Sequence, residues 1–129
     1  MTELGLIGPV EIRVPPDPSL SRVLRLAASG MASLAGFTID EIEDIKIAVS
    51  EVLLALIEHG SGNPVEVQFE SDDHSFKLRG RSFADNFDIE HPDLVLCRSV
   101  LAGVCDSHTI DHVDNQAHIW AEVTHKTIE

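Results

Sequence analysis

The chain has 129 residues, of which 43% are apolar and 24% are charged. This length suits one domain with one hydrophobic core, and the composition is typical of a globular protein rather than a disordered chain. The formal net charge of −13 argues against nucleic acid as a partner, because its phosphates would be repelled. No apolar run is long enough to cross a bilayer, and the N-terminus lacks a basic segment before an apolar one. We therefore expect one cytoplasmic domain over residues 1–129, without membrane contact.

The first third of the chain predicts a strand followed by a helix. Alternating apolar residues predict a strand over residues 10–14, which two prolines end. Asp17 then offers an N-cap with Pro18 at the first helical position, and Gly36 ends this helix. The apolar stripe predicted to face the core is Leu20, Val23, Leu24, Ala27, Met31 and Leu34.

A second helix is predicted immediately afterwards, and its start is well specified. Thr38 and Glu41 have the spacing of a capping box, and Phe37 with Ile42 has the spacing of a hydrophobic staple. The helix should end near Gly60. Its predicted buried stripe is Ile42, Ile45, Val49, Val52, Leu53 and Leu56.

The rest of the chain predicts four strands and one more helix. Strands are expected over residues 65–69 and 75–81, and a final hairpin over 104–113 and 117–123. Pro92 suits the start of the third helix. Its expected core face is Leu94, Cys97, Val100 and Leu101. The order βααββαββ predicts an α+β fold, a two-layer α/β sandwich with three helices on one face of a largely antiparallel mixed sheet.

The second helix carries the clearest functional pattern. Residues 47–60 contain Glu51 and, eight positions later, His59. Together with the run Ser21-Arg22-Val23 and the order of elements, this pattern resembles the anti-sigma-factor serine kinases, which belong to the ATPase superfamily of gyrase and histidine kinases. The resemblance extends over roughly residues 9–125 and implies the histidine kinase-like ATPase fold. It also places Glu51 at the position of the family's base for phosphoryl transfer.

The resemblance further implies a partner-binding surface on the first helix. Arg22 matches the family's partner-contacting arginine, and Arg25 lies one turn away. Two arginines in a strongly acidic protein would suit an acidic segment of a partner, because a guanidinium can donate two hydrogen bonds to one carboxylate. The expected partners are a sigma factor, an anti-anti-sigma protein, or both, and a homodimer is expected by resemblance alone. The alternative is that both arginines only offset nearby acidic residues.

The nucleotide-binding motifs of that family are not kept. Ala55 stands where the family has its Mg²⁺-binding asparagine, and a methyl group cannot coordinate a hard cation. Residues 80–84 lack the family's adenine-binding aspartate and its later glycines. The phosphate loop is replaced by His91-Pro92-Asp93, with a proline that has no N–H and a carboxylate where phosphate charge would lie. We therefore predict no ATP or Mg²⁺ cofactor, no enzymatic activity, and a vestigial role for Glu51.

The loss of the ligand predicts that its pocket is filled. Phe83 and Phe87 lie in the segment that forms a lid in the family. Burial of each ring would contribute about 1.5–3 kcal/mol, so we expect both to pack inward. The competing expectation is a disordered polar lid.

Other readings of the same residues are structural. Glu51 shares its helix with Asp44 and Glu58, and these three could form a solvated acidic face opposite the core. His59 would be favourable at a helix C-terminus whatever its ancestry.

No metal site is predicted from the seven histidines and two cysteines. Cys97 and Cys105 fit no metal or redox spacing and are expected to be reduced core thiols. The histidine-rich hairpin would place His108 and His112 on one strand face, with His118 and Trp120 opposing them, but this set lacks a firm metal-ligand spacing. Besides the regulatory binding module, two alternatives stay open: an active serine kinase or ATP-binding protein with an altered site, and a dimerisation domain from a sensor system.

Overall fold

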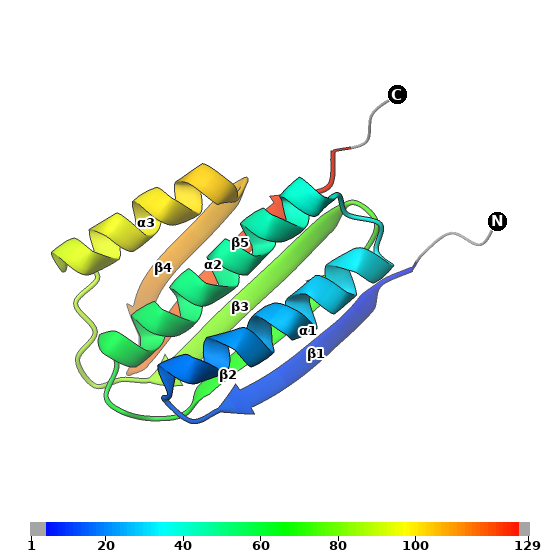
Figure 1. Cartoon of the computed structure of the whole chain (residues 1–129). Helices are drawn as coiled ribbons and strands as arrows, with labels where there is room; N and C mark the ends of the chain where they lie inside the picture. Colours follow the sequence, from blue (N-terminus) through cyan, green and yellow to red (C-terminus); the bar gives the residue numbers. More distant parts are fainter. Residues whose placement is uncertain (1–4, 127–129) are drawn as a thin grey trace.

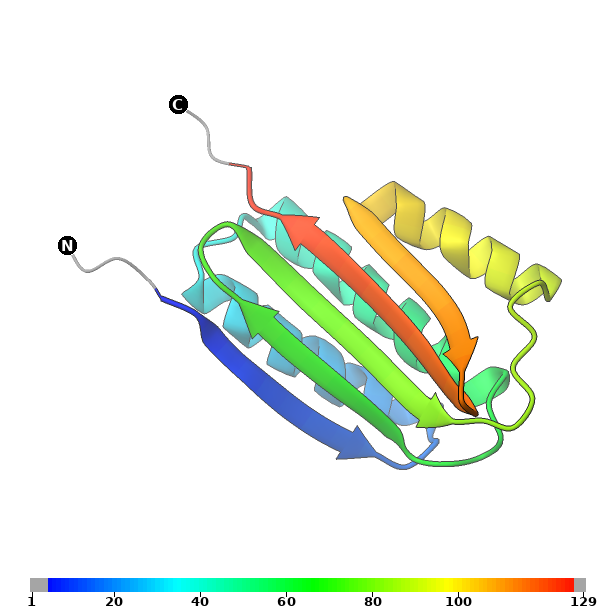
Figure 2. The same cartoon turned by 180° about the vertical axis from the view of Figure 1, so that it is seen from behind.

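A computed structural model describes residues 5–126, which form two layers (Figure 1). Five strands make one sheet, and three α-helices cover one of its faces, whereas the other face is uncovered (Figure 2). The predicted order βααββαββ is confirmed. The elements are β1 (Ile7–Val14), the 3₁₀ turn η1 (Pro18–Leu20), α1 (Ser21–Leu34), α2 (Ile39–Glu58), β2 (Val65–Ser71), β3 (Ser75–Phe83), α3 (Pro92–Val104), β4 (Ser107–Val113) and β5 (Gln116–Thr124).

The strand order in the sheet is β1-β2-β3-β5-β4. Every neighbouring pair is antiparallel, so the expected α+β sandwich is confirmed but the expected mixed sheet is wrong within the described residues. The last hairpin explains the order, because β5 returns between β3 and β4. Its two-residue turn is Asp114-Asn115, and both residues have positive φ, 52° and 59°, as a tight turn between right-twisted strands requires.

Local capping fixes where the helices begin. The predicted capping box of α2 is confirmed: Thr38 Oγ1 accepts from the Glu41 N–H at 3.2 Å, and Glu41 Oε1 accepts from the Thr38 N–H at 2.8 Å. Asp17 caps the short turn η1 instead of α1 itself, because its Oδ1 accepts from the Ser19 N–H at 3.0 Å. Side chains within a few residues therefore cap α2 and η1, whereas α1 continues from η1 without a side-chain cap of its own.

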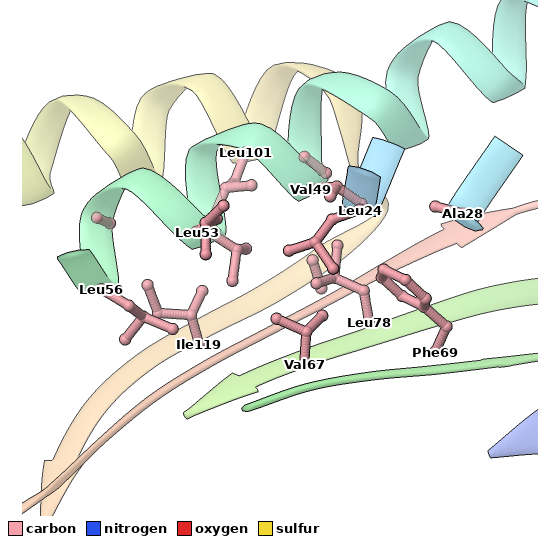
Figure 3. Packing of buried hydrophobic residues seen from close by; sticks show 14 of the residues in the cluster. Leu24, Ala28, Val49, Leu53, Leu56, Val67, Phe69, Leu78, Leu101 and Ile119 are labelled. Carbon is pink, nitrogen blue, oxygen red and sulfur yellow. The ribbon is translucent and has the colours of Figure 1, made fainter. Parts of the chain in front are cut away.

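The core lies between the inner face of the sheet and the three helices. Figure 3 shows Leu53 and Leu56 of α2 pointing toward Ile119 and Val67 of the strands. Helix α2 lies between α1 and α3 and packs against both as well as against the sheet. Its buried face is therefore wider than predicted. In addition to most of the predicted stripe, Ala48 and Ala55 are buried.

The predicted core stripe of α1 is wrong in part. Val23 and Leu34 are 49% and 72% exposed, and Leu26 is also exposed. The face of α1 that packs consists mostly of alanines, with one leucine and one methionine, and the alanines allow close approach to α2 and the sheet. It comprises Leu24, Ala28, Met31, Ala32 and, just beyond the helix, Ala35. The larger apolar side chains on the other side of α1 are left uncovered.

Among residues 5–126, no helix combines the length and the apolar character that a membrane crossing requires.

Candidate functional site between α2 and α3

A cavity of about 300 Å³ lies between α2 and α3. Glu51 and Ala55 of α2 border it on one side, and Leu94 and Cys97 of α3 border it on the other. This volume is at the lower end of the range for small-molecule sites, about 300–1,000 Å³. The cavity therefore brings the predicted Glu51 position into a concave site, but a small one.

Glu51 is half-buried and faces α3, so the reading of a solvated face opposite the core is wrong. The physical reason is the central place of α2, which is covered on both flanks. Burial raises the pKa of the Glu51 carboxyl, and the charge of Glu58 adds to this effect. The two cysteines are free thiols, as predicted. Burial, with the Glu51 charge as a second cause, raises the pKa of the Cys97 thiol to about 11.

Three polar side chains gather where α2 ends and α3 begins. His59 is the C-cap residue of α2, and its N–H donates to the Ala55 carbonyl at 3.1 Å. His91 is the N-cap residue of α3, and its Nδ1 accepts from the Asp93 N–H at 3.1 Å. The His59 and His91 rings have centroids 4.6 Å apart, and His59 Nε2 lies 3.4 Å from Asp93 Oδ2.

Sequence reasoning missed this cluster. It took His91-Pro92-Asp93 only as a replaced loop and His59 only as a favourable helix end. The signal available was Pro92, which marks the first position of a helix and so places His91 at the N-cap. The contact with His59 depends on the meeting of two helix ends that are 32 or more residues apart in the chain, and no local pattern reveals it.

The lid prediction is confirmed for one ring and wrong for the other. Phe87 is 4% exposed, and its ring lies near the His112 ring, with centroids 6.1 Å apart. Phe83 is 47% exposed. The strand β3 continues through Phe83, and strict alternation along it turns this side chain to the uncovered face of the sheet. Beside Phe87, Ala84 is fully buried, and its carbonyl oxygen lies 2.6 Å from His112 Nε2.

The four aromatic residues of the last hairpin do not oppose one another as predicted. Ile110 lies opposite Ile119 in the core, so His108 and His112 share the helix-covered face with it. His118 and Trp120 alternate with Ile119 and line the uncovered face. The register therefore separates the two pairs by the thickness of the sheet.

The two predicted partner-binding arginines have different environments. Arg22 is exposed, and among residues 5–126 it belongs to no ion pair. Arg25 is half-buried between α1 and α2, and its Nη1 donates to Ser50 Oγ at 3.0 Å and to Ser21 Oγ at 3.4 Å. Arg25 thus links two helices, and of the two arginines only Arg22 is exposed.

A larger hollow, of about 840 Å³, lies on the uncovered face of the sheet, away from Glu51. Charged side chains of both signs line it, and two of them, Arg81 and Glu66, pair at 3.3 Å. We assign the candidate site to the smaller cavity, because Glu51 lines it.

Residues 14–99 match the histidine kinase-like ATPase domain family. This match covers more than half of the chain and agrees with the fold, so the chain belongs to this family. The predicted resemblance and the predicted fold are both confirmed.

Within the family, the chain is similar to the serine-protein kinases RsbW. It is 32% identical to RsbW of Bacillus subtilis over 108 residues, which are 81% of this chain and 64% of that protein. It is 35% identical to RsbW of Staphylococcus aureus strain JH9 over 86 residues, which are 63% of this chain and 54% of that protein. The chain thus spans about two thirds or less of these curated relatives.

Among solved structures, the fold is similar to that in the crystal structure of the RsbU and RsbW domains of a Mycobacterium tuberculosis protein. The TM-score is 0.73 at 15% identity, and the match covers 94% of this chain and 34% of that chain. At this identity the likeness bears on the fold alone.

Proposed function

We propose that this domain is a regulatory protein-binding module of the anti-sigma type, which controls transcription by binding a sigma factor, an anti-anti-sigma protein, or both. Its similarity to the RsbW kinases supports the class. The observation that carries the binding role is an exposed apolar surface on α1, described next. ATP binding and phosphoryl transfer are not part of the proposed function.

The α1 face, as we name it, consists of Arg22, Val23, Leu26, Gly30 and Leu34. These residues lie within about a third of a turn of one another on a helical wheel, opposite the packed face. Val23, Leu26 and Leu34 are 49%, 68% and 72% exposed. Gly30 lies at the middle of this face, and nothing lies within 4 Å of the place of a Cβ there. A continuous apolar surface with one cation at its edge is typical of a protein-binding site.

The residues beside Glu51 do not fit a Mg–nucleotide complex. The side chain that faces the cavity one turn after Glu51 is the methyl group of Ala55, which offers no oxygen to a hard cation. At the start of α3, Pro92 has no N–H to donate to a phosphate, and the Asp93 carboxylate would repel one. Phe87 and Ala84 are buried in the segment before α3. Together these features support a module that works without ATP.

The binding proposal is tested with purified proteins. The chain is titrated with each sigma factor and each anti-anti-sigma protein of its source organism, and binding is followed by calorimetry. We expect Leu26→Asp to weaken binding by at least tenfold and Arg22→Ala by at least threefold, about 0.6 kcal/mol. Arg79→Ala is the matched control, because Arg79 is an exposed arginine on the opposite, uncovered face of the molecule. Circular dichroism confirms that each variant is folded.

If both variants, Leu26→Asp and Arg22→Ala, bind the partner protein with the same affinity as the unaltered chain, the α1 face is not the partner interface. Sedimentation of the isolated chain tests the expected homodimer separately. If Leu26→Asp abolishes a homodimer and leaves partner binding unchanged, the α1 face is the dimer contact.

A second candidate function is an active serine kinase or ATP-binding protein with an altered nucleotide site. The observation that favours it is the half-buried Glu51 carboxyl at the cavity, with its raised pKa. Calorimetric titration with Mg-ATP distinguishes the two. We expect no dissociation constant below about 100 μM, which corresponds to about −5.5 kcal/mol. Tighter binding, together with phosphate transfer to a partner that Glu51→Gln abolishes, would establish the kinase instead.

A further inference from the structure

His59, His91 and Asp93 form a cluster of potential metal ligands at the junction of α2 and α3. One ligand atom from each lies within 4.8 Å of the other two. His59 Nε2 is fully buried and makes no hydrogen bond among residues 5–126, because its contact with Asp93 Oδ2 at 3.4 Å lacks hydrogen-bond geometry. A buried ring nitrogen without a partner carries a desolvation penalty. Something other than the described side chains would relieve it.

We propose that this cluster binds a divalent transition-metal ion, Zn²⁺ in the first place. Two imidazole nitrogens and one carboxylate oxygen are the ligand set of sites in which three protein groups hold zinc and a water completes the tetrahedron. Metal–ligand bonds of about 2.0–2.2 Å place tetrahedral ligand atoms about 3.4 Å apart. The His59 Nε2–Asp93 Oδ2 distance is 3.4 Å, and the His91 Nδ1–Asp93 Oδ2 distance is 3.9 Å. Mg²⁺ and Ca²⁺ prefer oxygen ligands and are the poorer candidates.

The ligands are held in place by the helix ends themselves. His59 is fixed by its backbone bond to Ala55 at the end of α2, and only 15% of its side chain is exposed. His91 Nδ1 accepts from the Asp93 N–H and so carries no proton; it is therefore the ring nitrogen that can bind an ion, in exchange for the cap hydrogen bond. The Asp93 side chain is 64% exposed and can rotate to adjust its distance. Binding therefore needs little rearrangement of the backbone.

The surrounding charge favours a cation. Glu58 and Glu51 line the neighbouring cavity, and the chain as a whole is strongly acidic. The C-terminal end of α2 attracts a cation, and the N-terminal end of α3 repels one, so the two helix dipoles oppose each other. The carboxylates then decide the sign of the local field. A bound ion would tie the end of α2 to the start of α3 at the border of the cavity beside Glu51.

The test measures metal binding alone and is independent of any protein partner or nucleotide. The untagged chain is freed of metal with a chelator and titrated with Zn²⁺ in competition with a chromogenic chelator. Co²⁺ is then used as a spectroscopic probe of tetrahedral coordination. We expect one Zn²⁺ per chain, visible absorption bands of tetrahedral Co²⁺, and a melting temperature that rises by several degrees with excess Zn²⁺.

Two variants remove ligands while keeping the fold. His91→Asn retains a capping side chain for α3, and Asp93→Asn retains the shape of the carboxylate. Each should weaken Zn²⁺ binding by at least tenfold while the melting temperature of the metal-free chain stays within a few degrees. His74→Asn is the matched control, because His74 is exposed and also lies 3.4 Å from an aspartate, Asp73, but belongs to no group of three potential ligands among residues 5–126.

The control variant should bind Zn²⁺ as the unaltered chain does. The proposal is overturned if the unaltered chain binds no Zn²⁺. It is also overturned if both ligand variants bind Zn²⁺ as tightly as the unaltered chain, since the ion would then be held elsewhere.

Discussion

The Glu41 carboxylate joins the start of α2 to the C-terminal end of the described chain. Its Oε1 accepts from the Thr38 N–H at 2.8 Å and lies 2.8 Å from His125 Nδ1. Its Oε2 accepts from the Lys126 N–H at 2.7 Å. Only 12% of the side chain is exposed. Burial opposes ionisation, but the hydrogen bonds from Lys126, Thr38 and His125 outweigh it and lower the pKa of Glu41 to about 2.

The sign of the effect on stability follows from this depressed pKa. The ionised form is favoured in the folded state, so its contribution is complete above the unfolded pKa of 4.5 and is lost as the pH falls from there to about 2. A shift of about 2.5 units corresponds to about 3 kcal/mol as an upper bound. Glu41→Gln keeps one oxygen acceptor and the capping geometry. We therefore expect it to lower the free energy of unfolding by about 1–2 kcal/mol at neutral pH.

Urea denaturation of the two proteins, measured from neutral pH down to about pH 2.5, provides the assay. The difference in unfolding free energy should shrink steadily below about pH 4.5. Glu43→Gln is the matched control, because Glu43 is exposed in the same helical turn and pairs only with Lys46 at 3.0 Å. It should change stability by less than about 0.5 kcal/mol. A Glu41→Gln difference that is below about 0.5 kcal/mol at neutral pH, or that does not vary with pH, would refute the reasoning.

Three further predictions concern stability and reactivity. Gly80→Ala should lower the free energy of unfolding by about 1–3 kcal/mol, because its Cβ would lie 2.6 Å from a Val52 methyl group. A change below about 0.5 kcal/mol in urea denaturation would show that α2 moves away from the sheet at little cost. Gly30→Ala should instead raise the free energy of unfolding by about 0.5–1 kcal/mol, because there is space for its Cβ and alanine favours a helix. A loss of stability in the same assay would mean that α1 is strained at this position. Burial raises the pKa of the Cys97 thiol to about 11 and that of the Cys105 thiol to about 12. Both thiols should therefore react with iodoacetamide at about pH 8 far more slowly in the folded chain than in the urea-unfolded chain. Equal rates would contradict the burial of these thiols.

The fold could be predicted from the sequence largely because the capping and turn signals that begin and end its elements are local. The Thr38–Glu41 capping box and the Asp114-Asn115 turn depend on neighbours within a few residues. Burial that depends on packing between distant segments was predicted less well. Helix α1 has more apolar residues than one face can bury, and only the packing against α2 decides that Leu24 is covered and Val23 is not.

The helix that carries the candidate site could be predicted from the sequence, but the environment of its side chains could not. The resemblance of the helix that carries Glu51 and His59 to the anti-sigma-factor kinases identified the region. A helical wheel of an isolated helix, however, shows one buried face, whereas α2 is covered on both flanks, and so Glu51 lies against α3. Phe83 could have been placed correctly by continuing the alternation of β3 for two more residues.

The order of strands in the sheet makes β1 and β4 its edges. Exposed edges can recruit a strand from another chain, and both are poor templates for this. β1 contains Pro9, which has no N–H, and its register with β2 shifts between Ile7 and Val10. β4 carries the charged Asp111, followed by His112. Recognition by strand addition is therefore disfavoured at either end of the sheet, as is edge-to-edge aggregation.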